Sequence, residues 1–134
     1  MNPAIAYEVN LPVSAAAVAE VFRDSGLSRP VADLARIQRM LDNADVTVTA
    51  WDGERLVGVG RALTDFSFCC YLSDLAVARA YQRQGIGREI VAQVQAVIGE
   101  ESMLLLLATP LAMSYYPHLG FESQDRAWMI PRRR

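Results

Sequence analysis

The stretch that decides the fold runs from residue 68 to residue 98 and reads FCCYLSDLAVARAYQRQGIGREIVAQVQAVI. Its first part, Phe68 to Val77, is mostly apolar and predicts a central strand. Its last part opens at Gly85 and Gly87 and then carries apolar residues at helical spacing, namely Ile86, Ile90, Val94 and Val97. A strand, a glycine-containing loop and a helix are therefore expected in direct succession.

Upstream of this stretch, the sequence predicts one strand and two helices. Ile5 to Val9 reads as a short strand, and an alanine-rich helix follows from the N-cap Ser14 to about Ser25, ended by Gly26. Arg29-Pro30 restarts a second helix. Its apolar residues, at spacings of three and four, form one face: Leu34, Ile37 and Leu41. We expect that face to meet a sheet.

Between the second helix and the central strand, the pattern changes to that of a hairpin. Val46 to Thr49 alternates apolar with polar residues, Asp52-Gly53 is typical of a two-residue turn, and Leu56 to Ala62 continues as the partner strand. Gly58 and Gly60 lie within that strand, where glycine suggests a bulge or the close approach of a ligand.

Downstream of the decisive stretch, Met103 to Ala108 predicts a strand that Thr109-Pro110 stops, followed by a short helix around Ala112 to Tyr116. Two final short strands are expected around Phe121 and Ala127 to Ile130. The predicted order is βααβββαβαββ. A strand, helix, strand passage requires a parallel crossover and the hairpin is antiparallel, so residues 1–134 are expected to form one α/β domain with a mixed central sheet.

Composition excludes several function classes. The chain has 134 residues and a net charge of -2, and all 13 of its basic residues are arginine. The lack of lysine removes Schiff-base chemistry and the phosphate-binding lysine of nucleotide triphosphatases. The near-neutral charge argues against a nucleic-acid partner. A single histidine, His118, and two adjacent cysteines give no metal site, so no metal is expected.

The apolar runs and the N-terminus also limit the possible locations. The longest purely apolar runs, such as Met103 to Ala108, are far below the roughly 20 residues that a membrane span needs. Met1 to Val9 does not read as a secretory signal. A cytoplasmic protein without a membrane partner is therefore expected.

The loop from Gln82 to Arg88 carries the chemistry. The first amides of a helix have no intrahelical acceptor, and the helix dipole favours negative charge there. Gly85 and Gly87 allow phosphate oxygens to approach the backbone, and Arg83 and Arg88 add positive charge at the edge. A dinucleotide loop needs a third glycine where Ile90 stands, and a Walker loop needs a lysine. A plain tight turn remains the alternative reading.

Three motifs together resemble the GNAT family of N-acetyltransferases: Leu75-Ala76-Val77, then Tyr81-Gln82-x-x-Gly85-Ile86-Gly87, then Tyr116-Pro117-His118-Leu119-Gly120-Phe121. The resemblance implies the acyl-CoA N-acyltransferase fold, with helices on both faces of the sheet, and acetyl-coenzyme A as the co-substrate. It assigns the diphosphate of that molecule to the loop, with these residues: Gln82, Arg83, Gln84, Gly85, Ile86, Gly87 and Arg88.

The resemblance also assigns roles to the strand and to one tyrosine. The backbone of Leu75, Ala76 and Val77 would pair with the pantetheine arm, and an amide at Ala76 or Val77 would stabilise the oxyanion. Tyr116 stands where the family places the acid that protonates the departing thiolate. A core aromatic is the alternative reading, and Tyr115 replaces Tyr116 if the register differs by one.

The general base is not assigned by the sequence. Many relatives carry a glutamate or histidine before the Leu75 triplet, but here Ser73 replaces it, so a water relayed by Ser73 or Tyr71 is one candidate. Asp74 is the nearest carboxylate. Strand alternation would point its side chain to the face opposite Ser73, which favours a structural role.

These residues lead to one principal hypothesis and two alternatives. The principal one is direct acetyl transfer from acetyl-coenzyme A to a primary amine on a small molecule or a peptide. The family resemblance also makes a homodimer possible. The first alternative is a non-catalytic sensor or interaction module that binds acyl-coenzyme A. The second is another nucleotide-binding α/β domain, which would bind adenine nucleotides that lack pantetheine.

Overall fold

The structure is a computed structural model that describes residues 4–134. Its centre is a five-stranded sheet in the order β1-β2-β3-β4-β5, in which each strand pairs antiparallel with the next except for the parallel pair β4 and β5. The strands are β1 (Ile5–Val9), β2 (Val46–Asp52), β3 (Arg55–Thr64), β4 (Cys69–Val77) and β5 (Met103–Leu105). The mixed sheet predicted from the sequence is confirmed.

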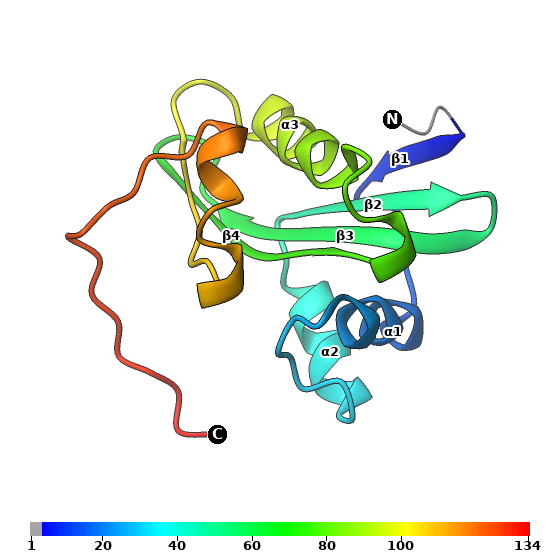
Figure 1. Ribbon diagram of the computed structural model, residues 1–134. Helices are drawn as coiled ribbons and strands as arrows, with labels where there is room; N and C mark the ends of the chain where they lie inside the picture. Colours follow the sequence, from blue (N-terminus) through cyan, green and yellow to red (C-terminus); the bar gives the residue numbers. More distant parts are fainter. Residues whose placement is uncertain (1–3) are drawn as a thin grey trace.

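Helices cover both faces of this sheet. The helices α1 (Ala15–Ser25) and α2 (Leu34–Asp42) lie on one face, and α3 (Ile86–Ile98) lies on the other (Figure 1). The predicted limits of α1 are confirmed, because Ser14 Oγ accepts a hydrogen bond from the Ala17 amide at 3.1 Å and Gly26 ends the helix at φ 85°. This left-handed conformation suits glycine, which has no Cβ to clash.

Each face of the sheet has its own apolar core. Under α3, three of the four residues that the helical spacing predicted are buried, namely Ile86, Ile90 and Val94, whereas Val97 is only partly buried. Val91 and Ile98 are buried beside them. Under α1 and α2, the core includes Val18, Phe22 and Ile37. Of the predicted α2 face, Ile37 is fully buried, whereas Leu34 at the first turn is 45% exposed. The two helix layers are therefore held on the sheet by separate cores.

The predicted second helix begins later than Arg29-Pro30. Here α2 starts at Leu34, with Asp33 as its N-cap accepting a hydrogen bond from the Arg36 amide at 3.0 Å. Residues 29–31 form a tight turn instead of a first helical turn, since the Val31 amide donates to the Arg29 carbonyl at 2.8 Å. Residues 26–33 form the α1–α2 loop.

The C-terminal part differs most from the prediction. The strand β5 has three residues and ends at Leu105, not Ala108, and the expected helix around residues 112–116 is replaced by two 3-10 turns. These turns are η2 (Pro110–Ala112) and η3 (Tyr116–Leu119), and both have proline in their first turn. Proline has no amide hydrogen, so Pro117 cannot donate the bond that would extend a helix through this segment.

The two final strands expected around Phe121 and Ala127–Ile130 are not formed, so the predicted order βααβββαβαββ is wrong after β5. The chain after η3 runs away from the sheet (Figure 1), and Trp128 and Ile130 are 96% and 97% exposed. Strands need a partner for their backbone hydrogen bonds. A β5 of three residues offers a very short edge to any further strand.

The glycines in β3 allow α3 to approach the sheet. Of the two expectations for this strand, a bulge is present beside Gly58, where the register against β2 shifts at Val57, and the close approach is made by α3. A Cβ added at Gly60 would lie 2.5 Å from Ile90 Cγ2, and one added at Gly58 would lie 3.0 Å from Ile90 Cδ1. Both distances are shorter than ordinary van der Waals contact. The glycines therefore fix the height of α3 above the sheet, and with it the position of its N-terminus.

We expect Gly60→Ala to destabilise the fold by about 1–3 kcal/mol, because the new methyl group overpacks a filled core. Urea unfolding followed by circular dichroism measures the loss. Gly58→Ala is the milder variant for comparison. Its new Cβ would lie 3.0 Å from the nearest atom instead of 2.5 Å, so the free energy of unfolding should fall by less. Equal stability of Gly60→Ala and the unchanged protein would contradict this account of the packing.

Candidate functional site

The site expected from the sequence lies where β4 and β5 separate. The two strands pair in parallel over only three positions, Cys69 to Tyr71 of β4 against Met103 to Leu105 of β5. From Leu72 to Val77, β4 pairs only with β3 within the described residues. One edge of β4 is therefore open along its C-terminal half, as an incoming extended ligand would require.

The register of β4 decides which amides face this open edge. The Ala78 amide donates to the Val57 carbonyl of the β3 side at 2.8 Å. Along an antiparallel pair, hydrogen-bonded and non-bonded positions alternate, so Ala76 also faces β3 whereas Val77 and Leu75 face outward. Of the two amides expected for an oxyanion, Val77 thus faces the open edge and Ala76 does not. The amide of Leu75 faces the open edge as well.

A β-bulge at Ser73 interrupts β4 just before these residues. Arg61 of β3 is opposite Asp74, and the next residue, Ala62, is opposite Leu72, so Ser73 is the extra residue. A bulge breaks the alternation of side chains. The expectation that Ser73 and Asp74 point to opposite faces is therefore wrong, since both accept hydrogen bonds from the Arg61 guanidinium.

Asp74 lies at the centre of a buried ionic cluster. Its side chain is fully buried and pairs with two arginines, Arg61 of β3 through Oδ2 and Arg29 of the α1–α2 loop through Oδ1, the latter at 2.5 Å. Arg61 Nη2 also donates to Ser73 Oγ at 3.0 Å, and Arg29 Nη2 donates to the Ser73 carbonyl at 2.6 Å. The structural role expected for Asp74 agrees with these contacts.

The loop before α3 has the shape expected of an anion site. Gly85 is the N-cap at φ 85°, and the first helical bond runs from the Glu89 amide to the Gly85 carbonyl at 3.0 Å. Within residues 4–134, the amides of Ile86, Gly87 and Arg88 donate to no protein acceptor. A Cβ on Gly85 would meet nothing within 4 Å, so the space beside it is open.

The side chains of this loop are arranged around that space. Arg83 is exposed and holds a left-handed φ of 64°, unusual for a residue with a Cβ. Arg88 Nη2 donates to the His118 carbonyl of η3 at 3.0 Å, which ties the turn to the start of α3. Gln82 Nε2 donates to the Val77 carbonyl at 3.0 Å, and Gln84 Nε2 to the Ala80 carbonyl at 3.3 Å.

The two adjacent tyrosines reach different parts of the site. The Tyr115 hydroxyl lies against Gly87, so close that a Cβ on that glycine would clash with it. Tyr116 packs edge-on against Phe121, with ring centroids 5.5 Å apart. Burial raises the pKa of both hydroxyls. The Arg88 guanidinium opposes this rise in the pKa of Tyr115, and Arg29 opposes it in that of Tyr116. The sequence singled out Tyr116 and missed the contact of Tyr115 with the loop.

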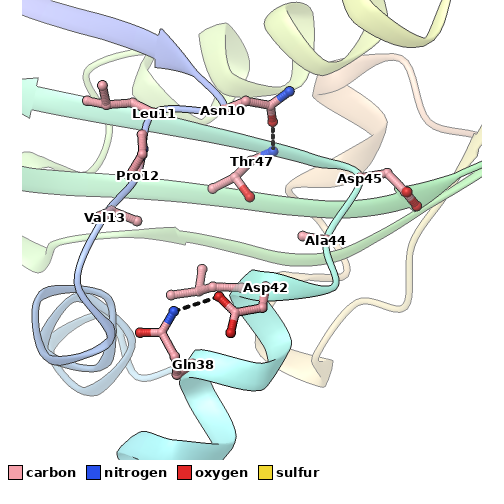
Figure 2. Close-up of a pocket in the computed structure, with 10 residues that line it drawn as sticks. Asn10, Leu11, Pro12, Val13, Gln38, Asp42, Ala44, Asp45 and Thr47 are labelled. Carbon is pink, nitrogen blue, oxygen red and sulfur yellow. Dashed lines mark hydrogen bonds between the residues drawn. The ribbon is translucent and has the colours of Figure 1, made fainter.

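A separate hollow of about 390 Å3 lies away from this site, between the β1–α1 connection, the end of α2 and the start of β2 (Figure 2). None of the predicted site residues lines it. Its two carboxylates already accept hydrogen bonds, Asp42 from Gln38 and Asp45 from the Thr64 amide, each at 2.8 Å. The hollow therefore adds no reactive group to the candidate site.

The described part of the chain offers neither a cluster of metal-ligating side chains nor a membrane-spanning helix. No group of three or more His, Cys, Asp or Glu side chains in that part of the chain is arranged to hold a metal ion. Among the helices of residues 4–134, none has the length and apolar character needed to cross a bilayer. Cys69 is exposed and Cys70 buried, and both thiols are free.

Comparison with known proteins gives one family. The family model described as an acetyltransferase (GNAT) domain matches residues 12–128. The uncharacterized N-acetyltransferase ycf52 of Gracilaria tenuistipitata var. liui is 30% identical over 94 residues, or 66% of this chain and 52% of that protein. The chain thus spans about half the length of the curated relative it matches.

Solved structures agree on the fold. SA2161 of meticillin-resistant Staphylococcus aureus, described as a probable acetyltransferase, superimposes with a TM-score of 0.83 at 25% identity, covering 96% of this chain and 98% of that one. The aminoglycoside N-acetyltransferase AAC(6')-Iy, solved in complex with CoA, gives 0.70 at 16% identity, covering 96% and 95%. The second likeness concerns the fold alone.

We expect Asp74→Asn to lower the free energy of unfolding by about 3–5 kcal/mol, because two guanidinium groups lose the carboxylate that pairs with them in the interior. Chemical denaturation measures this. Glu20→Gln is the matched control: it breaks an ion pair with Arg23 whose side chains are 68% and 56% exposed, and such pairs contribute at most about 1 kcal/mol. Equal effects of the two changes would contradict the assignment of Asp74 as the centre of the cluster.

Proposed function

The chain belongs to the GNAT acetyltransferase family, and from that premise we propose that it transfers an acetyl group from acetyl-coenzyme A directly to a primary amine. The observation that carries this proposal is the open edge of β4 beside the unpaired amides at the start of α3. An extended thioester with a diphosphate at its other end matches both features.

In this proposal the loop amides hold the diphosphate. The amides of Ile86, Gly87 and Arg88 point out of the helix end, and the helix dipole adds positive potential there. The exposed Arg83 supplies charge from the edge. Gln82 and Gln84 shape the loop through their hydrogen bonds to backbone carbonyls.

The pantetheine arm then runs back along β4, from Val77 toward Leu75. These two residues turn their backbone groups outward, and the Val77 carbonyl already accepts from Gln82 Nε2. The arm therefore pairs with the Val77 amide and the backbone of Leu75, as an added strand would. Ala76, which lies between them, pairs with β3 through its amide and does not bind the arm. The acetyl carbonyl falls near the outward amides, which stabilise its oxygen as negative charge develops.

The chemical step needs no covalent enzyme intermediate. The amine nitrogen bonds to the thioester carbon, the carbon–sulfur bond breaks, and the thiolate takes a proton from Tyr116. The nitrogen loses its extra proton to water held near Ser73 or Tyr71. Ser73 Oγ already accepts from Arg61, so its own hydrogen is left to orient such a water.

A second candidate function is a sensor or interaction module that binds acyl-coenzyme A without catalysis. The cluster at Asp74 favours it, because the carboxylate nearest the bulge is neutralised by Arg29 and Arg61 and is not available as a base. Only the transferase proposal includes an acceptor: a small-molecule amine or a peptide amine, the first being the class on which the aminoglycoside acetyltransferase acts.

Two measurements separate these functions. Calorimetry with acetyl-coenzyme A, desulfo-coenzyme A and ADP tests cofactor binding. If neither coenzyme A form binds, both functions are rejected. If ADP binds as tightly as acetyl-coenzyme A, the site is a general nucleotide site. A panel of primary amines, followed by release of free thiol and by mass of the product, tests the transfer. Tight binding without any acetylated amine supports the sensor.

We expect Gly85→Ala to raise the dissociation constant of acetyl-coenzyme A about tenfold, because its Cβ enters the space beside the loop and strains a left-handed residue. Calorimetry measures the change. Gly99→Ala is the matched control at the other end of α3, with φ 81° and equally open surroundings. If both substitutions weakened binding equally, strain in the helix would be responsible, and not the filling of the space beside the Gly85 loop.

We expect Tyr116→Phe to lower kcat by about 100-fold or more while acetyl-coenzyme A affinity stays within twofold, because only the acid is removed. Stopped-flow or steady-state thiol release measures it. Since burial raises the pKa of Tyr116, the acid should stay protonated beyond pH 10, with kcat falling only above that pH. Loss of activity in Tyr115→Phe instead would transfer the acid role to Tyr115.

A further inference from the structure

The side chain of Arg29 joins two parts of the chain that are far apart in sequence. It leaves the α1–α2 loop and reaches β4, whose contact residues are 44 and 45 positions away. Its three nitrogens all donate: Nε to Asp74 Oδ1 at 2.5 Å, Nη2 to the Ser73 carbonyl at 2.6 Å, and Nη1 to the Ser28 carbonyl of its own loop at 2.6 Å. The planar fork of arginine suits such a set of acceptors.

Both distant acceptors belong to the bulge of β4. Ser73 is the extra residue of that bulge and Asp74 follows it, directly before Leu75, whose amide faces the open edge. A change in the position of Arg29 therefore acts on the backbone next to the proposed acetyl site. The α1–α2 loop is coupled to the strand edge through one side chain.

The need to balance the charge of Asp74 does not explain why Arg29 is present beside Arg61. Two guanidinium groups pair with one carboxylate, so the cluster carries a net charge of +1, and Arg61 alone would balance the charge of Asp74. Arg61 is almost fully buried, with 9% of its side chain exposed, whereas Arg29 is 25% exposed and opens toward solvent. An extra buried cation is costly unless it is well bonded. The surplus guanidinium is the one that holds the loop.

The charge of Arg29 also reaches the proposed acid. The charge of Arg29 acts on the Tyr116 hydroxyl, where it opposes the effects of burial and of Tyr115 on the pKa of that group. The guanidinium thus bonds to the bulge and also adds positive charge to the surroundings of Tyr116. These are the two protein features that an acceptor amine must meet to attack the thioester.

We propose that Arg29 is a positioning residue, which holds the α1–α2 loop on the bulge of β4 and so sets where the acceptor amine stands relative to the strand edge and Tyr116. This inference rests on the proposed function. Arg29 itself need not touch the reacting atoms. A misplacement of about 1 Å in such a site can cost about 100-fold in rate.

The first test needs no known acceptor. In Arg29→Gln, hydrogen exchange followed by mass spectrometry should show faster exchange in peptides covering residues 26–33 and Leu75 to Val77. In Arg61→Gln, which removes the other guanidinium from Asp74, the loop peptide should exchange as in the unchanged protein. Unaltered exchange of the loop in Arg29→Gln overturns the proposal.

The second test is kinetic and uses the fastest acceptor among tryptamine, spermidine, kanamycin and an alanine-initiated tripeptide. In Arg29→Gln, we expect kcat/KM for the acceptor to fall by 10-fold to 100-fold while KM for acetyl-coenzyme A stays within twofold. Arg29→Lys keeps the charge but not the fork, so it should not restore the acceptor kinetics. Arg39→Gln, an exposed arginine of α2, is the control for loss of charge.

The outcomes are distinguishable from failure of the proposed function. If the unchanged protein binds acetyl-coenzyme A but acetylates no amine, the transferase proposal fails, whatever Arg29 does. If the unchanged protein is active and Arg29→Gln retains its acceptor kinetics, only the positioning role fails. Full rescue by Arg29→Lys would show that charge alone suffices and would also overturn that role.

Discussion

The arrangement of the site depends on one buried carboxylate. Asp74 joins β4 to β3 through Arg61 and to the α1–α2 loop through Arg29, so three separate segments meet at a single side chain. An ionised carboxylate in the interior is tolerated only when it is paired and hydrogen-bonded. The bulge at Ser73 is what turns Asp74 toward both arginines and, one residue later, turns Leu75 toward the open edge.

The separation of β4 from β5 follows from the same part of the sheet. Parallel pairing ends at Tyr71, two residues before the bulge, and the bulge bends the strand away from its former neighbour. The open edge then leads to the loop at Gly85, where α3 begins. Gly58 and Gly60 seat α3 close on the sheet, so the unpaired amides at its start keep a fixed height relative to β4.

Features set by adjacent residues could be predicted from the sequence, whereas features set by distant partners could not. The Ser14 cap, the Gly26 stop, the β2–β3 hairpin and the Gly85 loop depend on a few neighbouring residues, and all of them form. The two-residue turn of the hairpin lies at Gly53 and Glu54, one residue later than predicted, because Asp52 pairs with Arg55. The bulge at Ser73 has no local mark, because Ser73 and Asp74 fit ordinary alternation. The contact between Arg29 and Asp74 spans 45 positions and carries no sequence pattern. The final strands failed for a related reason: their apolar residues are suitable, but a strand also needs a partner edge.

The groups proposed to act on the thioester are mostly backbone amides, and this shapes what the side chains are for. A backbone amide cannot be removed by substitution, and its direction is fixed by register and by the conformation of its neighbours. Side chains such as Asp74, Arg61 and Arg29 act on the site by holding that register. The proposed chemistry is therefore carried largely by the backbone of the fold, and the proposed positioning of the acceptor depends on the side chains that hold the α1–α2 loop.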